Sequence, residues 1–360
     1  MKILHISYAY DFSDGGISSV VEQVIREQKK INLSVEWIAS SHFSNPFKRG
    51  NLIKKILDIN PSIVHLHGLW RIHTRITNKL HRYKIPYIIC PHGMLDKWAL
   101  NQSNIKKKIA WQFWEREALE KSFFIHSLCE SEFEGIKKIN PSWKSYQITN
   151  GINIPEIKPL SEIGKPKSWG NKIPENANVL LFMGRFHKKK GIEQLLAAWE
   201  IISQLECSKN WWLCFTGSGD IKIKKNLKKY KNIDRIIITE PAFGDEKERI
   251  LRNSSAFILN SFSEGLPMAV IEAMSFRLPC LISENCNLNK AIDLGAAIRS
   301  NPSIDEIVKS LQLFFKMKRE ERDNISDLAF EYVKNNHNWR DITLRTKNLY
   351  ESIYQDTKFK

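Results

Sequence analysis

The chain of 360 residues lacks any run approaching the ~20 consecutive apolar residues that a membrane-spanning helix requires. Its N-terminus lacks the long apolar segment and the small-residue cleavage site of a signal peptide, so residues 1–10 are interpreted as a first strand. The six cysteines contain no C-x-x-C pair, and most of them stand in apolar runs. We therefore expect reduced cysteines in the core of a cytoplasmic protein.

Acidic residues are scarce relative to basic ones. The sequence has 55 Lys and Arg against 39 Asp and Glu, which gives a formal net charge of +16. Such an excess favours nucleic acid, an anionic membrane surface or phosphorylated substrates as partners, although an ordinary solvated basic surface gives the same number. The sequence contains no helix-turn-helix, zinc-finger or RNA-recognition motif, so nucleic acid is not the partner that we expect.

The first ninety residues alternate short apolar runs with amphipathic stretches. The predicted strands are residues 2–8, 34–39, 63–66 and 87–90, and the predicted helices are residues 18–30, 52–59 and 75–83. This alternation predicts a parallel sheet covered by helices.

The pattern stops in a stretch rich in proline and glycine, residues 153–174, and then restarts. The second set of predicted strands is residues 178–183, 211–216, 233–239, 256–260 and 279–283, with helices at 192–205, 246–253 and 269–276. The sequence thus predicts two doubly wound α/β domains, residues 1–165 and 175–337. We expect them to face a central cleft that binds the ligand at the carboxyl ends of the strands.

Two loops between a strand and a helix have the composition of anion sites. In the first, Gly15 and Gly16 would let the backbone approach a bulky anion at a helix N-terminus, although a plain tight turn explains them equally well. In the second, Gly184 is followed by Arg185, which can form a bidentate pair with phosphate, and by Lys190 at the helix start. A solvated basic turn is the alternative for the second loop.

A third segment carries two carboxylates. Glu264 begins a turn that enters a helix near Pro267, and Glu272 lies further along that helix. Two acidic acceptors near a phosphate site suit a sugar and a ribose, which are dense in hydroxyl donors. The spacing alone favours the alternative, in which Glu264 caps the helix and Glu272 lies on the surface.

The fourth segment places His92 at the end of a predicted strand, where it could act as an acid, a base or a hydrogen-bonding group. A lone histidine is more often structural. His65 and His67 have the i, i+2 spacing of a metal pair, but no convincing third ligand follows them, so no metal site is expected.

In this order, the four segments resemble the family-4 retaining glycosyltransferases of the GT-B fold over nearly the whole chain. Residues 264–267 with Glu272 are similar to the family's E-x7-E signature, and residues 184–191 to its donor-phosphate segment. Residues 91–96 resemble members that build bacterial surface polysaccharides such as lipopolysaccharide, capsule or exopolysaccharide.

The resemblance implies the cationic part of a donor site. Gly15 and Gly16 would line the donor diphosphate from the N-terminal side, and Gly184 would belong to the same site. Arg185 and Lys190 would hold the diphosphate and stabilise negative charge on the departing nucleotide.

The resemblance also implies groups that bind hydroxyls. Glu272 would bind the ribose and Glu264 the donor sugar, with Gly265, Leu266 and Pro267 in the donor-binding turn. His92 would hydrogen-bond the donor sugar near the reacting face. The family keeps the anomeric configuration and usually needs no metal, so we expect no cofactor beyond the nucleotide-sugar substrate.

One position departs from the family's pattern, and one further segment agrees with it. Arg277 stands where the family usually has glycine, at a position where a left-handed helix end disfavours a side chain. Residues 338–353 have an apolar helical pattern, and in this family a final helix, here about residues 338–360, crosses back onto the first domain.

Residues 104–121 combine Lys106, Lys107 and Lys108 with Trp111, Phe113 and Trp114. This mixture suits contact with anionic lipid headgroups, although an aromatic stripe that faces the core gives the same pattern. The hypothesis is a peripheral contact with the inner face of the cell membrane.

These observations predict a glycosyltransferase that moves a sugar, a hexose or a related sugar, from a nucleotide donor, UDP- or GDP-linked. The acceptor would be a glycan or a polyprenyl-diphosphate-linked molecule. The alternatives are another GT-B chemistry, such as a sugar-nucleotide epimerase, and a basic nucleic-acid-binding protein.

Overall fold

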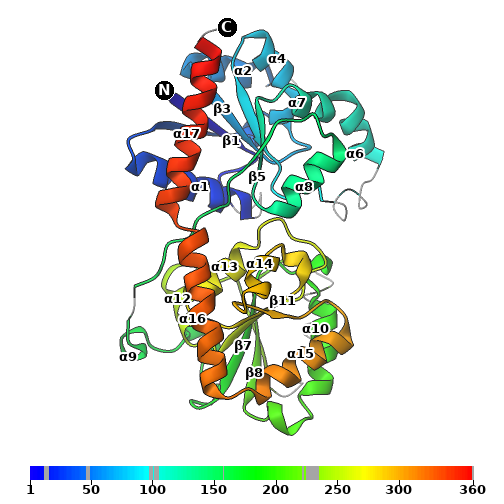
Figure 1. Cartoon of the computed structure of the whole chain (residues 1–360), viewed down its shortest axis with the longest axis vertical. Helices are drawn as coiled ribbons and strands as arrows, with labels where there is room; N and C mark the ends of the chain where they lie inside the picture. Colours follow the sequence, from blue (N-terminus) through cyan, green and yellow to red (C-terminus); the bar gives the residue numbers. More distant parts are fainter. Residues whose placement is uncertain are drawn as a thin grey trace. The chain divides into compact units, whose positions relative to one another are not determined.

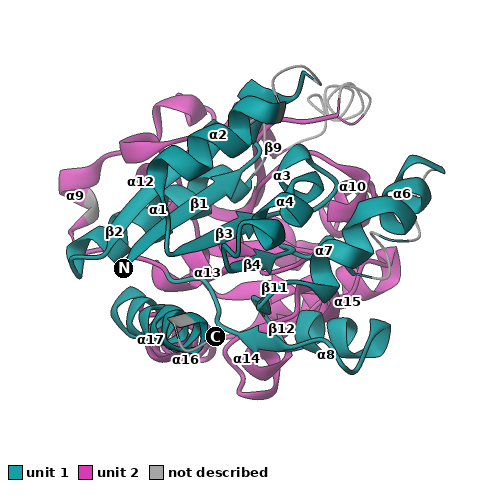
Figure 2. Ribbon diagram, turned by 90° about the horizontal axis from the view of Figure 1, so that it is seen from above, with its two compact units in different colours: residues 1–151, 339–360 teal, residues 152–338 magenta. Residues whose placement is uncertain are grey.

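A computed structural model describes residues 1–11, 16–45, 49–96, 100, 105–156, 158–220, 223 and 235–358. The chain divides into two compact units (Figure 2). The first unit is Met1–Gly151 with Trp339–Lys360, and the second is Ile152–Asn338. Residues 152–165, which the sequence analysis placed in the first domain, therefore belong to the second unit.

The first unit is built on a six-stranded sheet in which all neighbouring strands are parallel. Its strands are β1 (Lys2–Ser7), β2 (Ser34–Ala39), β3 (Ile63–His67), β4 (Tyr87–Cys90), β5 (Phe124–Ser127) and β6 (Ser145–Gln147), in the order β2-β1-β3-β4-β5-β6. The four strands predicted for this region are confirmed to within one residue. The strands β5 and β6 were not predicted.

Helices cover both faces of this sheet (Figure 1). They are α1 (Gly16–Lys30), α2 (Arg49–Ile59), α3 (Ile72–Arg75), α4 (Thr77–Arg82), α6 (Ile105–Ala110), α7 (Arg116–Glu120), α8 (Glu130–Ile139) and α17 (Trp339–Lys358), with a π-helical turn at Trp111–Glu115. The single helix predicted at residues 75–83 is instead the end of α3 followed by α4.

Alternate residues of each strand supply the two cores of the first unit, because successive side chains of a strand point to opposite faces. Ile3, Ile63 and Ile88 pack against the final helix α17, with a contribution from α1. Their neighbours in sequence, Leu4 and Val64 among them, pack on the other face with residues of α2, α4 and α8. The final helix thus packs on the first unit rather than on the second.

The second unit contains another six-stranded parallel sheet. Its strands are β7 (Asn178–Met183), β8 (Trp211–Thr216), β9 (Ile236–Thr239), β10 (Ala256–Leu259), β11 (Cys280–Ile282) and β12 (Ile298–Arg299), in the order β12-β11-β10-β7-β8-β9. Its helices are α9 (Leu160–Ile163), α10 (Ile192–Ile202), α12 (Gly244–Arg252), α13 (Met268–Ser275), α14 (Asn289–Asp293), α15 (Ile304–Lys316) and α16 (Arg319–Asn336).

The centre of the second unit is fully apolar. In Figure 1, β7 and β8 lie between α12, α13 and α16 on one side and α10 and α15 on the other. Because both faces are covered, β7 is a continuous apolar run from Val179 to Met183 rather than an alternating one. Phe182 and Trp199 are completely buried, and each side chain of this size stabilises the fold by roughly 1.5–3 kcal/mol.

The order of strands identifies the edge where a ligand can bind in the second unit. The chain leaves β7 toward β8 and β9, then returns to the other side of β7 to form β10, β11 and β12. The loops that follow β7 and β10 therefore start side by side at the carboxyl edge of the sheet. In doubly wound sheets this reversal point is where ligands bind.

Two further observations concern the helices and the cysteines. Among the helices that the structure describes, none combines the length and apolarity needed to cross a bilayer. All six cysteines are free thiols, and five of them are buried, as the sequence predicted.

The end of α13 shows the left-handed conformation that the family's glycine would favour. Arg277 has φ 59°, a conformation that costs a side-chain-bearing residue about 1–2 kcal/mol. Its guanidinium forms an ion pair with Asp327 and lies 4.1 Å from the ring centre of Phe330. These contacts with α16 offset the backbone cost.

Candidate functional site

The loops after β7 and β10 are packed tightly against each other. Gly191 has φ 68°, and a Cβ atom there would lie 2.1 Å from the carbonyl oxygen of Asn260. The backbone N–H of Phe262 donates to the carbonyl of Lys189 at 2.7 Å. Only glycine at position 191 permits this approach, so the two loops form one rigid site.

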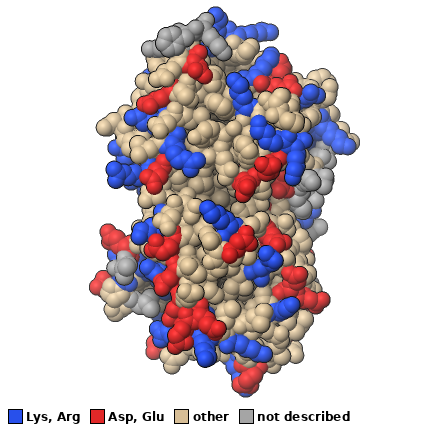
Figure 3. Space-filling model, viewed as in Figure 1, with Lys and Arg blue, Asp and Glu red and all other residues tan. Residues whose placement is uncertain are grey.

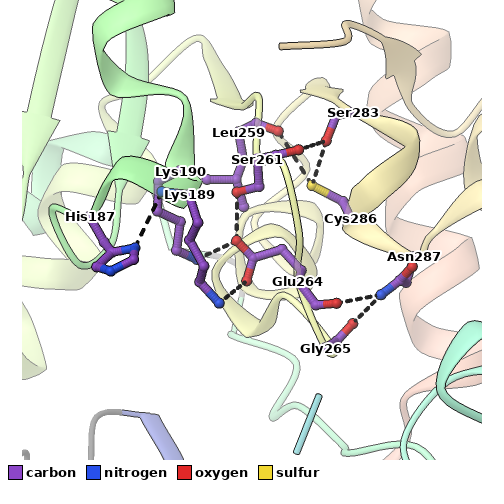
Figure 4. Close-up of polar contacts among 10 residues, drawn as sticks. All are labelled: His187, Lys189, Lys190, Leu259, Ser261, Glu264, Gly265, Ser283, Cys286 and Asn287. Carbon is purple, nitrogen blue, oxygen red and sulfur yellow. Dashed lines mark hydrogen bonds and ion pairs between the residues drawn. The ribbon is translucent and has the colours of Figure 1, made fainter. Parts of the chain in front are cut away.

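A buried ion pair joins the two loops (Figure 4). Lys190 Nζ lies 2.6 Å from Glu264 Oε1, and the hydroxyl of Ser261 donates to the same oxygen at 2.5 Å. Lys189 Nζ lies 4.0 Å from Glu264 Oε2. The side chains of Glu264 and Lys190 are only 6% and 15% exposed, so this pair is poorly screened by solvent.

The cations determine the charge state of Glu264. Burial by itself would raise the pKa of this carboxyl, but Lys190 first and Lys189 second hold the pKa below its ordinary value. Asn287 fixes the turn, because its side-chain amide donates to the carbonyl oxygens of Glu264 and Gly265 at 2.5 and 2.9 Å. Asn287 was not predicted, because no local pattern links it to a turn more than twenty residues away.

The alternative in which Glu264 caps the following helix is wrong. The N-cap of α13 is Pro267, and no side chain forms a cap hydrogen bond there. Leu266 is half-buried and packs against the core of the second unit. The backbone N–H groups at the start of α13 therefore receive no side-chain cap from Glu264.

The loop after β7 carries a strong positive potential. The pKa of His187 is lowered, first by partial burial and then by the charges of Lys189, Arg185 and Lys188. Arg185 is exposed and forms no ion pair with any described residue. A bound anion would neutralise this cluster, and the start of α10 adds the partial positive charge of a helix N-terminus.

Gly184 leaves open space beside the same loop. A Cβ atom at Gly184 would meet no other atom within 4 Å. Gly217, at the end of β8, instead approaches so closely that its own Cβ would lie 1.9 Å from the Gly184 carbonyl oxygen. Gly217 was not predicted, although the Gly-Ser-Gly run that follows β8 could have indicated it.

Glu272 has a partner that the sequence did not suggest. It lies on α13, and its Oε1 atom is 2.5 Å from Nζ of Lys247 on α12. Lys190 and Glu264 are therefore in direct contact, whereas Glu272 forms a separate ion pair. The side chain of Glu272 is 20% exposed. It is therefore neither buried nor a freely solvated surface residue.

The candidate residues of the first unit lie at the ends of β1 and β4. Gly16 is the first residue of α1 and is exposed, with no atom within 4 Å of its added Cβ. Gly15 lies outside the described residues. His92 is half-buried and left-handed, with φ 54°. The following Gly93 donates its N–H to the buried carboxylate of Glu132 at 2.6 Å, which anchors the turn.

The structure brings a third histidine next to His65 and His67, which the sequence did not indicate. His5 of β1 brings its ring next to theirs, and the ligand atoms of the three residues lie within 4.8 Å of one another. His67, Cys90 and His92 form a second such group. The register of β1 against β3 pairs His5 with His65, a non-local pairing that the sequence does not reveal.

The basic and aromatic segment has one side on the core and another side exposed. Trp111 is half-buried and packs against the core, and Arg75 stacks on Trp114 at 4.3 Å. Phe113 is 72% exposed and Ile105 is 76% exposed. Lys and Arg side chains gather over α6 in Figure 3. Trp111 therefore faces the core, while an outer apolar stripe lies among basic residues.

A hollow lies beside this segment within the first unit. Its volume is ≈ 370 Å³, and it is lined by Trp70, Leu100, Lys107, Lys108, Trp111 and Ile139. Aromatic walls with two ammonium groups suit a molecule that has both an apolar and an anionic part.

Comparison with known proteins agrees with this architecture. Residues 165–331 match the family model "Glycosyl transferases group 1". Sucrose-phosphate synthase from Thermosynechococcus elongatus superposes with a TM-score of 0.80 at 15% identity, covering 99% of this chain and 100% of that one. Anabaena HepE in complex with UDP and glucose superposes with a TM-score of 0.77 at 13% identity, covering 98% and 100%.

Curated relatives are similar over shorter stretches. An uncharacterized glycosyltransferase of Haemophilus influenzae is 33% identical over 150 residues, 40% of this chain and 41% of the relative. The Escherichia coli UDP-Gal:alpha-D-GlcNAc-diphosphoundecaprenol alpha-1,3-galactosyltransferase is 26% identical over 170 residues, 46% and 43%. The putative teichuronic acid biosynthesis glycosyltransferase TuaC of Bacillus subtilis is 23% identical over 227 residues, 63% and 54%. The matches thus span about half the length of these relatives or less.

The two sheets and the structural neighbours define a protein of the GT-B fold, as predicted. Within this fold, residues 165–331 are the region that matches the family model "Glycosyl transferases group 1". The Lys190–Glu264 pair lies inside that matched region.

Proposed function

We propose that this protein is a glycosyltransferase that moves a sugar from a nucleotide-sugar donor to a glycan or lipid-linked acceptor during the synthesis of a bacterial surface polysaccharide. The observation that carries the proposal is the buried Lys190–Glu264 pair, which joins two loops at the strand-order reversal of the second unit. Both loops lie in the region that matches the family model "Glycosyl transferases group 1". The names of the bacterial relatives support the choice of pathway.

The donor would bind through its diphosphate and its hydroxyls. Arg185 is exposed and without an ion pair, and it would bind the diphosphate together with Lys190. Glu264 would accept hydrogen bonds from the sugar while it orients Lys190. Glu272 would bind the ribose, which requires Lys247 to share its carboxylate. Gly265, Leu266 and Pro267 would form the donor-binding turn, and the start of α13, which has no side-chain cap, would add the partial positive charge of a helix N-terminus.

The remaining donor contacts would come from glycines and from one histidine. Gly184 has open space above its Cα, which would let the diphosphate approach the backbone. Gly16 would do the same at the N-terminus of α1, and His92 would bind a hydroxyl of the sugar. The base would be uracil or guanine, and the UDP in the HepE complex favours uracil.

The chemistry that suits these groups is transfer with retention of the anomeric configuration, as in family 4. As the bond to the anomeric carbon breaks, negative charge grows on the diphosphate, and Arg185 and Lys190 would stabilise it. Preorganised charges of this kind usually supply the largest part of catalysis. Because the proposed cations are side chains, we propose no metal in the reaction.

The acceptor would be bound at the membrane. Ile105, Ile109 and Phe113 are exposed and spaced four residues apart along α6 and the turn that follows. Lys106 and Lys108 between them are also exposed, so the segment would enter an anionic lipid surface. The adjacent hollow, with Lys107, would take the diphosphate of a polyprenyl-linked acceptor. The protein would therefore work at the cytoplasmic face of the cell membrane.

A ligand screen tests the donor. We expect the melting temperature to rise with one class among UDP-, GDP- and ADP-sugars, because a ligand that binds only the native state stabilises it. The rise should be lost in Lys190→Ala and kept in Lys188→Ala, which removes an exposed lysine of the same loop. Conversion of the donor sugar without any acceptor would indicate an epimerase and overturn the proposal.

Sedimentation with liposomes tests the membrane surface. The protein should sediment with phosphatidylglycerol vesicles and stay in solution with phosphatidylcholine vesicles. Phe113→Ser should weaken the binding, whereas Leu313→Ser, which alters another exposed apolar residue, on α15, should not. Equal binding to both lipids would refute this part of the proposal.

A further inference from the structure

A row of polar side chains, most of them histidine rings, lies inside the first unit on the sheet face covered by α1 and α17. Five histidines contribute to it from the strands and their ends: His5, His65, His67, His92 and His126. Gln28 of α1 and Tyr350 of α17 complete the row, and both are buried. Such a cluster in an apolar core is costly unless every polar atom has a partner.

The partners form one unbroken chain of hydrogen bonds. From its inner end, His126 Nε2 lies 2.7 Å from the Ile148 carbonyl, and its Nδ1 lies 3.3 Å from His65 Nε2. His65 Nδ1 is 2.8 Å from the Tyr350 hydroxyl, which is 3.3 Å from Gln28 Nε2.

The second half of the chain ends at the candidate site. Gln28 Oε1 is 2.9 Å from His5 Nε2, and His5 Nδ1 is 2.9 Å from His67 Nε2. His67 Nδ1 is 3.0 Å from His92 Nε2. The remaining nitrogen of His92, Nδ1, has no hydrogen-bond partner among the described residues.

The direction of the chain follows from its inner end. A carbonyl can only accept, so His126 must donate from Nε2 to Ile148. A neutral imidazole has one donor and one acceptor nitrogen, so His126 Nδ1 accepts and His65 must donate from Nε2. His65 Nδ1 then accepts the proton of the Tyr350 hydroxyl.

The same reasoning passes through the glutamine to the site. The Tyr350 hydroxyl has used its proton, so Gln28 must donate its amide N–H to that oxygen and present its carbonyl to His5. His5 therefore donates from Nε2 to Gln28 Oε1, which leaves His5 Nδ1 as an acceptor. His67 then donates from its Nε2 to His5 Nδ1. His92, the last ring, must donate from Nε2 to His67, which leaves Nδ1 with a free lone pair.

We infer that this one-way chain, through the positioning residues Gln28 and Tyr350, fixes the proton of His92 on Nε2 and makes Nδ1 a hydrogen-bond acceptor. His92 then binds a hydroxyl of its substrate and rejects a phosphate or carboxylate oxygen, which could only accept. This consequence for the substrate rests on the proposed function, whereas the position of the proton does not. All five histidines share the Nε2–H form.

The charge state of the rings agrees with the geometry. Burial lowers the pKa of His5 and His126 to about 4 and of His92 to about 3, and it lowers the pKa of His65 and His67 well below the ordinary value. The rings are therefore neutral near pH 7. A metal ion on His5, His65 and His67 is the rival arrangement, and it would have to displace the hydrogen bond at 2.9 Å between His5 and His67.

Nuclear magnetic resonance of protein labelled with 15N-histidine reads the proton positions without any substrate. Long-range 1H–15N spectra distinguish a protonated ring nitrogen from an unprotonated one. The five histidines should all show a protonated Nε2 and an unprotonated Nδ1. Protonation of His92 on Nδ1 would overturn the inference, as would one tightly bound equivalent of Zn²⁺ that shifts the ring signals of His5, His65 and His67.

Tyr350→Phe interrupts the chain of hydrogen bonds in its middle, because it removes the hydroxyl that joins His65 to Gln28. Gln28 can then turn over, so His5, His67 and His92 should become mixtures of both tautomers, whereas His65 and His126 keep the Nε2–H form. Tyr87→Phe is the matched control, because its buried hydroxyl donates to the Ala118 carbonyl at 2.9 Å and lies outside the chain. If Tyr350→Phe leaves all five rings unchanged, the chain does not set the proton of His92.

Gln28→Leu provides a second break, should Tyr350→Phe not fold. It disconnects His5, His67 and His92 from His126 and the Ile148 carbonyl. These three rings should therefore become mixtures of both tautomers, as in Tyr350→Phe. In either variant, His92 would carry its proton on Nε2 in half of the molecules and on Nδ1 in the other half. Only the first half could bind the donor hydroxyl, so KM for the donor would rise by about twofold with little change in kcat. A spectrum that changes while KM stays constant would refute the role of Nδ1 toward the sugar but not the proposed activity.

Discussion

Mild acid should unfold the first unit, because it contains histidines that fold in the neutral form. His5, His65, His67, His73 and His126 are each at most 7% exposed. Burial lowers the pKa of every one of them from 6.5, to about 4 for His5, His73 and His126. The unfolded chain therefore binds more protons than the native state, so stability present above pH 6.5 is lost as the pH falls toward about 4.

The size of the effect follows from these pKa values. Between about pH 7.5 and about pH 5.5, each such histidine removes about 1.4 kcal/mol from the free energy of unfolding, or about 7 kcal/mol for five. Glu115 acts in the opposite direction, because burial raises its pKa to about 7. Its protonation in the native state restores about 2 kcal/mol over the same interval. Burial also raises the pKa of Glu132, which offsets a further part of the loss, while His92, whose pKa burial lowers to about 3, adds about 1.4 kcal/mol to it. The net loss is therefore on the order of 5 kcal/mol.

Urea denaturation at the two pH values measures this loss. With a slope of about 2 kcal/mol per molar urea, the midpoint should fall by about 2.5 M. Limited proteolysis with mass spectrometry should show cleavage in the first unit before the second. His73→Gln should reduce the acid-induced loss by about 1.4 kcal/mol, and His81→Gln, at an exposed histidine, should leave it unchanged. A midpoint that moves by less than about 0.5 M would refute the reasoning.

Three further predictions concern the second unit. Lys190→Ala and Glu272→Ala should each lower turnover roughly a hundredfold in a radiolabelled-sugar transfer assay, while Lys188→Ala should change it little; near-normal kinetics in the first two would refute the site assignment. Arg277→Gly should be more stable than Arg277→Ala by about 1 kcal/mol in thermal unfolding, because both lose the side-chain contacts and only alanine keeps the left-handed strain. Gly217→Ala should lower stability by about 1–3 kcal/mol, because its Cβ would overlap the Gly184 carbonyl; a thermal midpoint equal to that of the native protein would contradict this.

Local patterns were sufficient for most strands and helices of the sheets. The apolar run 178–183 and the strand 87–90 were predicted with the bounds that the structure has. Such signals are contained within a few residues, because a strand in a covered parallel sheet must be apolar on both sides. The strand β6 (Ser145–Gln147) was missed because it is three residues long and largely exposed at the sheet edge.

The residues of the candidate site were predicted only in part, because the sequence gives local signals and not the contacts between distant residues. The sequence indicated Lys190 and Glu264 as site residues, but it gave no sign that the two would be 2.6 Å apart. It also gave no sign of Lys247 or Asn287, which meet Glu272 and Glu264 only because α12 and the loop after β11 pack beside α13.

By itself, the sequence determined the alternation of strands and helices, the composition of the loops after β7 and β10, and the position of His92 at a strand end. These properties are local, and hydrophobic periodicity or turn chemistry encodes them directly. Only the tertiary structure decided which side chains meet: Gln28 and Tyr350 are 322 residues apart in the chain and share a hydrogen bond in the core. Contacts of that kind depend on how whole elements pack, because each partner is placed by a different strand or helix.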